Sequence, residues 1–128
     1  MDELLFKEET YKIIGCAMEV YNELGFGFLE GVYQEALAIE LNIKKIYFKN
    51  QVMLEIYYKG HKLEKEYKPD FIVDDKIVIE LKAEDKINNS DIAQIINYLK
   101  ATKLKLGLII NFGNKEKLEW RRIVLENK

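Results

Sequence analysis

Apolar side chains in the first third of the chain recur at helical spacing. From about Glu8 to Leu24 they stand three or four residues apart, and the next residue, Gly25, is of the type that commonly ends helices. A second apolar stripe of the same spacing runs from Glu30 to Leu41. The pattern predicts two amphipathic helices joined by the short connection Gly25–Gly27.

The middle of the chain has the alternation and the β-branched residues of strands. A strand is predicted from Asn50 to Tyr58. The apolar runs Phe71–Val73 and Ile77–Leu81 flank the acidic turn Asp74-Asp75 and predict a β-hairpin.

The last third predicts a helix between two strands. Residues 88–90, Asn-Asn-Ser, are helix-capping types, and a helix is expected from Asp91 to about Lys100. The apolar run Leu106–Phe112 is typical of a strand buried on both faces, and the tail through Leu125 could add an edge strand. Strand, helix and strand in this order predict a right-handed crossover between parallel strands. The expected fold class is α/β, with a mixed central β-sheet flanked by helices and two helices at the N-terminus.

Charged residues interrupt the hairpin near its open end. Glu80 and Lys82 lie two residues apart, so they point to the same face of their strand, opposite the face of Ile77, Ile79 and Leu81. A three-residue loop, residues 74–76, would place Asp70 directly across from Glu80, with Cβ atoms roughly 5 Å apart, whereas a two-residue loop would put the two carboxylates on opposite faces. Adjacent carboxylates repel unless a proton or cation lies between them, and their hard oxygen atoms suit magnesium or manganese.

Composition narrows the chemistry. A chain of 128 residues is expected to form a single domain over residues 1–128, with a core that needs no disulfide. Cys16 and His61 are the only cysteine and histidine, which leaves little material for a zinc site or a histidine-dependent triad. The single cysteine fits a reducing cytoplasm, and no stretch is apolar enough to predict a membrane span. The net charge of -2 argues mildly against a dedicated nucleic-acid binder, although a locally basic cleft could still bind one.

Two motifs resemble a known family. Pro69-Asp70 followed by Glu80-Leu81-Lys82 is similar to the signature of the PD-(D/E)XK nuclease superfamily. Residues 27–33, Gly-Phe-Leu-Glu-Gly-Val-Tyr, match the motif that names the GxxExxY family within that superfamily, and Gln94 and Tyr98 follow downstream. The resemblance covers nearly the whole chain and implies a restriction-endonuclease-like core.

The resemblance also implies a catalytic site. Asp70 and Glu80 would bind Mg²⁺, with Mn²⁺ as a substitute, together with the backbone carbonyl of Leu81. Lys82 would position a water molecule or neutralise charge at the phosphorus atom. Glu30 would add a carboxylate, on the metal directly or through water.

Three of these residues also have simpler explanations. Glu30 lies in the first turn of a predicted helix, where a carboxylate complements the helix dipole. Gln94 and Tyr98 are four residues apart and share a helical face, which suits the margin of a core. The resemblance suggests instead that Gln94 hydrogen-bonds near the metal or Lys82, and that Tyr98 orients a catalytic group or contacts phosphate.

The sequence therefore predicts a metal-dependent nuclease that cleaves phosphodiester bonds, with DNA as the expected partner and RNA as the alternative. A second hypothesis is a non-catalytic module that binds nucleic acid or protein and retains the fold. A third treats Glu80 and Lys82 as a surface ion pair of an assembly domain, and a homo-oligomer stays open. The lysines at positions 59, 62, 65 and 68 are explained by a solvated edge or by contact with phosphate.

Overall fold

A computed structural model describes residues 5–126, and within them the α/β class predicted from the sequence is confirmed. The helices are α1 (Lys7–Leu24), α2 (Glu30–Ile43) and α3 (Asn89–Thr102). A five-stranded mixed sheet has the order β1-β4-β5-β6-β7. Its strands are β1 (Phe48–Asn50), β4 (Phe71–Val73), β5 (Ile77–Lys82), β6 (Leu106–Asn111) and β7 (Glu119–Val124).

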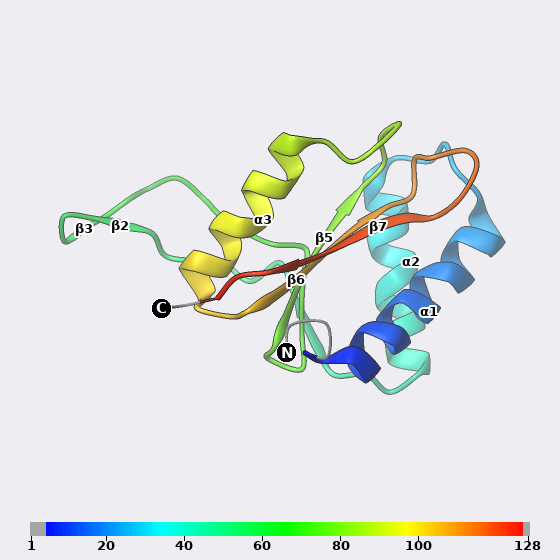
Figure 1. The fold of residues 1–128 in the computed structure, drawn as a ribbon, viewed down its shortest axis with the longest axis horizontal. Helices are drawn as coiled ribbons and strands as arrows, with labels where there is room; N and C mark the ends of the chain where they lie inside the picture. The colour runs from blue at the N-terminus through cyan, green and yellow to red at the C-terminus, as the bar shows by residue number, and fades with distance from the viewer. Residues whose placement is uncertain (1–4, 127–128) are drawn as a thin grey trace.

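The helices cover both faces of this sheet (Figure 1). The predicted N-terminal helices α1 and α2 lie together on one face, where Tyr33, Leu37 and Leu41 of α2 pack with the odd-numbered residues of β5. On the other face α3 packs Ile95 and Leu99 against Val78 and Ile109. The face of β5 that carries Glu80 and Lys82 is therefore ionic only at the end of the strand, because Val78 in its middle belongs to a second apolar core.

The predicted hairpin is confirmed, and of its two possible registers the structure has the one with a three-residue loop. Phe71 lies opposite Ile79 and Val73 opposite Ile77, so the next pair towards the open end is Asp70 with Glu80. At the closed end Asp74 and Asp75 have φ of 53° and 55°, which is the left-handed region that aspartate tolerates better than most residues. The sequence of the turn therefore fixes which residues face each other at the open end.

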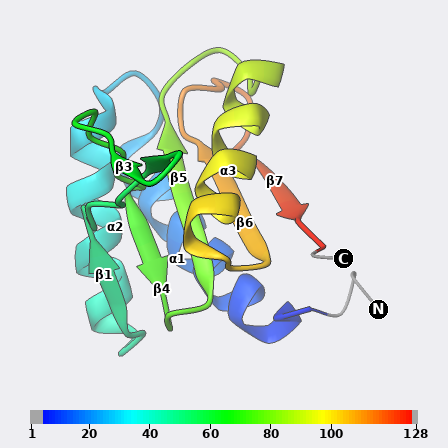
Figure 2. The ribbon, with the colours of Figure 1, turned by 90° about the vertical axis from the view of Figure 1, so that its left-hand side faces the viewer.

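The C-terminal half also follows the prediction. β5 and β6 are parallel and connected through α3, and β7 adds an antiparallel edge. Helix α3 begins with a complete capping box, in which the Asn88 side chain accepts from the Asp91 N–H and the Asp91 side chain accepts from the Asn88 N–H. This cap fixes the start of α3 beside the end of β5 (Figure 2).

The predicted strand from Asn50 to Tyr58 is wrong. Pairing with β4 ends at Asn50, and the next residue, Gln51, has φ of 55° and turns the chain out of the sheet. Residues 51–68, which we call the arm, form an extended hairpin with only a short two-stranded ladder, β2 (Tyr57–Tyr58) and β3 (His61–Lys62). The arm projects beyond the sheet on the side of α3 (Figure 1).

The loops at the carboxyl ends of β5 and β6 are fastened together. Asn111 is fully buried and donates to the Glu84 carbonyl, while its side-chain oxygen accepts from the Glu84 N–H. Gly113 lies against the same loop, so close that a Cβ atom there would stand 2.3–2.5 Å from backbone atoms of Ala83 and Glu84. Among the described residues, no helix is long and apolar enough to cross a membrane.

We predict that Gly113→Ala lowers the free energy of unfolding by about 1–3 kcal/mol, because the new methyl group must push two backbone segments apart. Urea denaturation measures this change. The matched control is Gly15→Ala, where a Cβ atom meets nothing within 4 Å and alanine should stabilise helix α1 by about 0.5–1 kcal/mol. Equal effects of the two substitutions would contradict the proposed close approach.

Candidate active site

Two carboxylates lie side by side at the open end of the hairpin. Asp70 is 9% exposed and Glu80 is 7% exposed. The Leu81 N–H donates to Asp70 Oδ2 at 2.8 Å, and the Asp70 N–H donates to Glu80 Oε1 at 3.2 Å. The two backbones thus hold one oxygen of each carboxylate, in the cross-strand arrangement that the register predicts.

This pair is electrostatically unfavourable when both groups are ionised. Burial, followed by repulsion from Asp70, raises the pKa of Glu80 to about 8. Burial also raises the pKa of Asp70, although the Leu81 N–H and the protonated Glu80 side chain oppose this shift. At neutral pH the pair therefore keeps a proton, and a cation could take the place of that proton.

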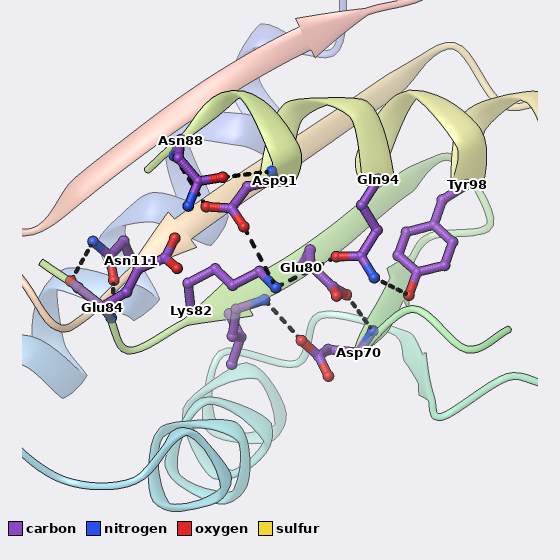
Figure 3. A network of polar contacts seen from close by, with 10 residues as sticks. Asp70, Glu80, Lys82, Glu84, Asn88, Asp91, Gln94, Tyr98 and Asn111 are labelled. Carbon is purple, nitrogen blue, oxygen red and sulfur yellow. Dashed lines mark hydrogen bonds and ion pairs between the residues drawn. The ribbon is translucent and has the colours of Figure 1, made fainter. Parts of the chain in front are cut away.

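Lys82 is held beside these carboxylates by helix α3 (Figure 3). Its ammonium group lies 3.6 Å from Asp91 Oδ1 and donates to Gln94 Oε1 at 3.4 Å. Because the side chain is only 20% exposed, its charge is partly protected from solvent screening. Lys82 is therefore oriented by two groups that lie one helical turn apart.

A chain of hydrogen bonds continues from Lys82 along α3. Gln94 donates through Nε2 to the Tyr98 hydroxyl at 3.3 Å, and that hydroxyl donates to the Lys68 carbonyl at 3.1 Å. The structure thus brings Gln94 next to Lys82, one of the two positions expected of it. Tyr98 orients Gln94 and ties α3 to the end of the arm.

Two acidic residues that the sequence analysis did not select lie at the same place. Partial burial is the largest cause that raises the pKa of Glu84 to about 7, and the neighbouring Asp91 carboxylate raises it further. Burial alone would raise the pKa of Asp91, but Glu84, the Asn88 N–H and Lys82 together lower it. In the described part of the chain, Glu84 Oε2 is buried and has no hydrogen-bond partner, and the raised pKa of Glu84 favours the neutral carboxyl at this place.

Sequence spacing contained a signal for both residues. Glu84 continues the alternation of Glu80 and Lys82 beyond the end of β5. Asp91 precedes Gln94 by three residues, which places it on the same face of α3 as Gln94 and Tyr98.

Glu30 reaches the site from the first turn of α2. The residue is exposed, yet partial desolvation of its carboxylate, followed by repulsion from Asp70, raises its pKa, and Lys82 opposes this shift. These interactions place Glu30 in the electrostatic field of the site, and a direct role on a metal stays a prediction.

The loop that carries Glu30 is anchored by the tyrosine of the same motif. The fully buried Tyr33 stacks on Phe112 with a centroid distance of 4.5 Å, and its hydroxyl donates to the Gly25 carbonyl and accepts from the Phe28 N–H. Gly27 has φ of 108°, which side chains rarely allow. The glycine and the tyrosine of the motif thus shape the loop that leads to the glutamate.

The donor atoms fit a hard divalent cation in part. Asp70 and Glu80 offer carboxylate oxygens, which Mg²⁺ and Mn²⁺ prefer. Within residues 5–126, however, no three His, Cys, Asp or Glu side chains gather closely enough to hold a metal by themselves. Two carboxylates with water and substrate oxygens would be an ordinary magnesium site. The Leu81 carbonyl as a ligand stays a prediction, since the contact seen for Leu81 is made by its N–H.

Comparisons with known proteins agree with this architecture. The sequence model of the PD-(D/E)XK nuclease superfamily matches residues 7–123. A solved structure, "Crystal structure of SSO0001", is similar with a TM-score of 0.58 and 18% identity, over 77% of this chain and 52% of that chain. The present chain thus spans about half the length of that protein, and the likeness concerns the fold alone. A comparison with curated proteins finds no match.

We predict that Glu80→Gln stabilises the metal-free protein in alkaline but not in acidic buffer. Folded Glu80 keeps its proton up to about pH 8, whereas an unfolded glutamate loses it near pH 4.3. Between these values the folded state binds more protons, so the free energy of unfolding falls as the pH rises.

Urea denaturation in EDTA should show the variant more stable than the wild type by about 1–3 kcal/mol near pH 8.5, with the gap closing towards pH 5. Glu64→Gln, at an exposed arm position, is the control and should leave the free energy of unfolding unchanged both near pH 8.5 and near pH 5. A gap that is the same at both pH values would contradict the raised pKa of Glu80.

Proposed function

The chain belongs to the PD-(D/E)XK nuclease superfamily, and on this basis we propose that it is a metal-dependent nuclease that cleaves phosphodiester bonds in DNA. We also assign it to the GxxExxY family. Gly27, Glu30 and Tyr33 occupy the positions of its motif, and the Tyr33 hydroxyl anchors the loop that contains Gly27 and leads to Glu30. Superfamily membership supports nucleic acid as the substrate class. The choice of DNA over RNA belongs to the proposal.

The observation that carries this proposal is the buried pair of Asp70 and Glu80 with Lys82 beside it. A structural ion pair would match one carboxylate with one lysine, but here two carboxylates share a buried place and need extra positive charge. Hydrolases that act on phosphodiesters use such pairs to hold Mg²⁺ or Mn²⁺. When bound, the ion would polarise a phosphoryl oxygen and lower the pKa of a water molecule.

Asp70 and Glu80 would hold that ion, with the Leu81 carbonyl as a further oxygen donor and Glu30 acting through a water molecule. The backbone bonds to Asp70 and Glu80 fix the direction of both carboxylates before substrate arrives, which reduces the reorganisation needed during the reaction. Hydrolysis breaks the ester bond between phosphorus and one sugar oxygen and forms a bond between phosphorus and the oxygen of water. The proton of that water would pass to the Glu30 carboxylate, and solvent water would protonate the sugar oxygen that leaves.

Lys82 would donate hydrogen bonds to the attacking water or to the phosphate oxygen on which negative charge develops. Asp91 and Gln94 limit the rotation of its ammonium group, so the entropy of positioning is lost on folding and not during the reaction. Gln94 and Tyr98 would act on the reaction through Lys82, as positioning residues.

We predict metal-dependent cleavage that is lost when any of the three central groups is changed. Wild type and the variants Asp70→Asn, Glu80→Gln and Lys82→Met are compared on single-stranded, double-stranded and forked DNA and on RNA, in Mg²⁺, Mn²⁺ or EDTA. Each substitution should lower the cleavage rate by about 100-fold or more. Gln94→Ala should lower the rate less, because the Lys82 ammonium group is still present and still paired with Asp91.

Asp75→Asn and Lys12→Met, an exposed turn carboxylate and an exposed lysine of α1 on the other face, serve as controls of equal charge change. Cleavage that persists in EDTA or in all three variants would refute the proposed site. A wild type that binds nucleic acid without cutting it, with binding unaffected by Asp70→Asn, would favour the non-catalytic module.

A further inference from the structure

The arm begins and ends next to the candidate active site. It leaves the sheet at Gln51, whose N–H donates to the Asp70 carbonyl, and it returns through Lys68 directly before Pro69 and Asp70. Within the arm, Leu54 donates to the Tyr67 carbonyl and Leu63 to the Ile56 carbonyl, each at 2.8 Å. The arm is therefore an ordered hairpin whose base carries one of the predicted metal ligands.

Between the arm and α3 lies a groove of about 630 Å³. Tyr57, Leu63, Lys65 and Tyr67 line it from the arm, and Lys100 and Lys103 line it from the helix. Leu63 is 42% exposed and Tyr57 is 58% exposed. The groove therefore has an apolar floor that is open to solvent, with amines at its margins.

Lysines outnumber carboxylates in this groove, since Lys65, Lys100 and Lys103 line it with one acid, Glu55, which is paired with Lys62 and accepts from the Tyr57 hydroxyl. Within residues 5–126, no ion pair joins Lys65, Lys100 or Lys103 to a carboxylate. Two other arm lysines differ, since Lys62 is paired with Glu55 and Lys68 with Glu66, at 3.1 and 3.3 Å. Three amines without an acidic partner thus line the groove, where they are complementary to a phosphate backbone.

The tyrosines of β2 point in different directions. Tyr57 lines the groove, whereas Tyr58, its neighbour on the strand, carries the Lys59 ammonium 5.4 Å from its ring centroid. Exposed aromatic rings beside lysines are what single-stranded nucleic acids stack upon. Double-stranded DNA would hide its bases from the Tyr57 ring.

A contact between two tilted tyrosine rings connects the lining of the groove to the site. Tyr67 lies against Tyr98 with a centroid distance of 4.5 Å, and Tyr98 is hydrogen-bonded to Gln94, which holds Lys82. Tyr67, on the wall of the groove, is thus two side chains away from the residue that holds Lys82.

We propose that this groove binds a single-stranded segment of the nucleic-acid substrate next to the bond that is cut, with bases stacked on Tyr57 and phosphates at Lys65, Lys100 and Lys103. The inference rests on the proposed nuclease function and adds a substrate class to it. It also gives a role to the exposed part of the arm, since Leu54 and Tyr67 pack against the second core whereas Tyr57 and Leu63 stay open to solvent.

Fluorescence anisotropy tests this with a labelled oligothymidylate of about 20 nucleotides and with a blunt duplex of equal length, in EDTA so that no strand is cut. Tyr57→Ala should weaken single-strand binding by about 5- to 150-fold. Tyr57→Phe should bind like the wild type, since the ring is kept. Tyr58→Ala, on the adjacent residue that does not line the groove, is the matched control and should have little effect.

The salt dependence tests the lysines separately. Lys100→Gln and Lys103→Gln should each reduce the slope of log affinity against log salt concentration by about 0.7, and Lys12→Gln on α1 should not change it. Equal effects of Tyr57→Ala and Tyr58→Ala, no single-strand binding by the wild type, or a preference for the duplex that ignores Tyr57 would overturn the inference.

The two proposals fail in different ways. Metal-dependent cleavage together with binding that is independent of Tyr57 would refute the groove and leave the nuclease. Binding that depends on Tyr57 without cleavage under any metal condition would refute the nuclease and leave a single-strand-binding groove.

Discussion

Two negative charges that are forced together inside the protein are the constraint on which the site depends. The hairpin register places Asp70 opposite Glu80, and backbone N–H groups hold both carboxylates there. Close carboxylates in a poorly solvated place cannot both ionise unless positive charge joins them. A register shift of one residue would point Asp70 to the opposite face and remove the constraint. The turn at Asp74 and Asp75 is thus as important to the site as the carboxylates themselves.

The rest of the fold supplies and restrains the surroundings of this pair. Helix α3, fixed at its start by the capping box of Asn88 and Asp91, brings Gln94 to Lys82. The site has more carboxylates than amines, so it favours a cation and repels a bare phosphate. A nucleic-acid substrate therefore needs positive charge elsewhere, and the lysines along the groove between the arm and α3 provide it. This division also explains how a chain with a net charge of -2 could act on a polyanion.

Local signals predicted the parts of the structure that local physics determines. Apolar spacing gave α1, α2 and α3 within a few residues, and the acidic turn indicated the hairpin, but it left two registers open, of which the structure has the one that joins Asp70 to Glu80. The strand predicted over residues 50–58 failed because alternation does not show whether a partner strand exists, and β4 offers pairing only as far as Asn50. Glu84 and Asp91 were missed because each had a sufficient local explanation, as a loop residue and as a helix start. Their convergence depends on Asn111 and on the packing of α3, which are contacts between distant parts of the chain.

The most direct test of the central claim is the number of protons released when the protein binds Mg²⁺ or Mn²⁺ near pH 7. Isothermal titration calorimetry gives this number when the same titration is repeated in buffers with different ionisation enthalpies. Because the pKa of Glu80 is about 8, a cation that takes the place of its proton should release close to one proton per ion bound. The release should disappear in Glu80→Gln. Absence of metal binding, or binding that releases no proton and is unchanged by Glu80→Gln, would contradict the claim that Asp70 and Glu80 form the metal site.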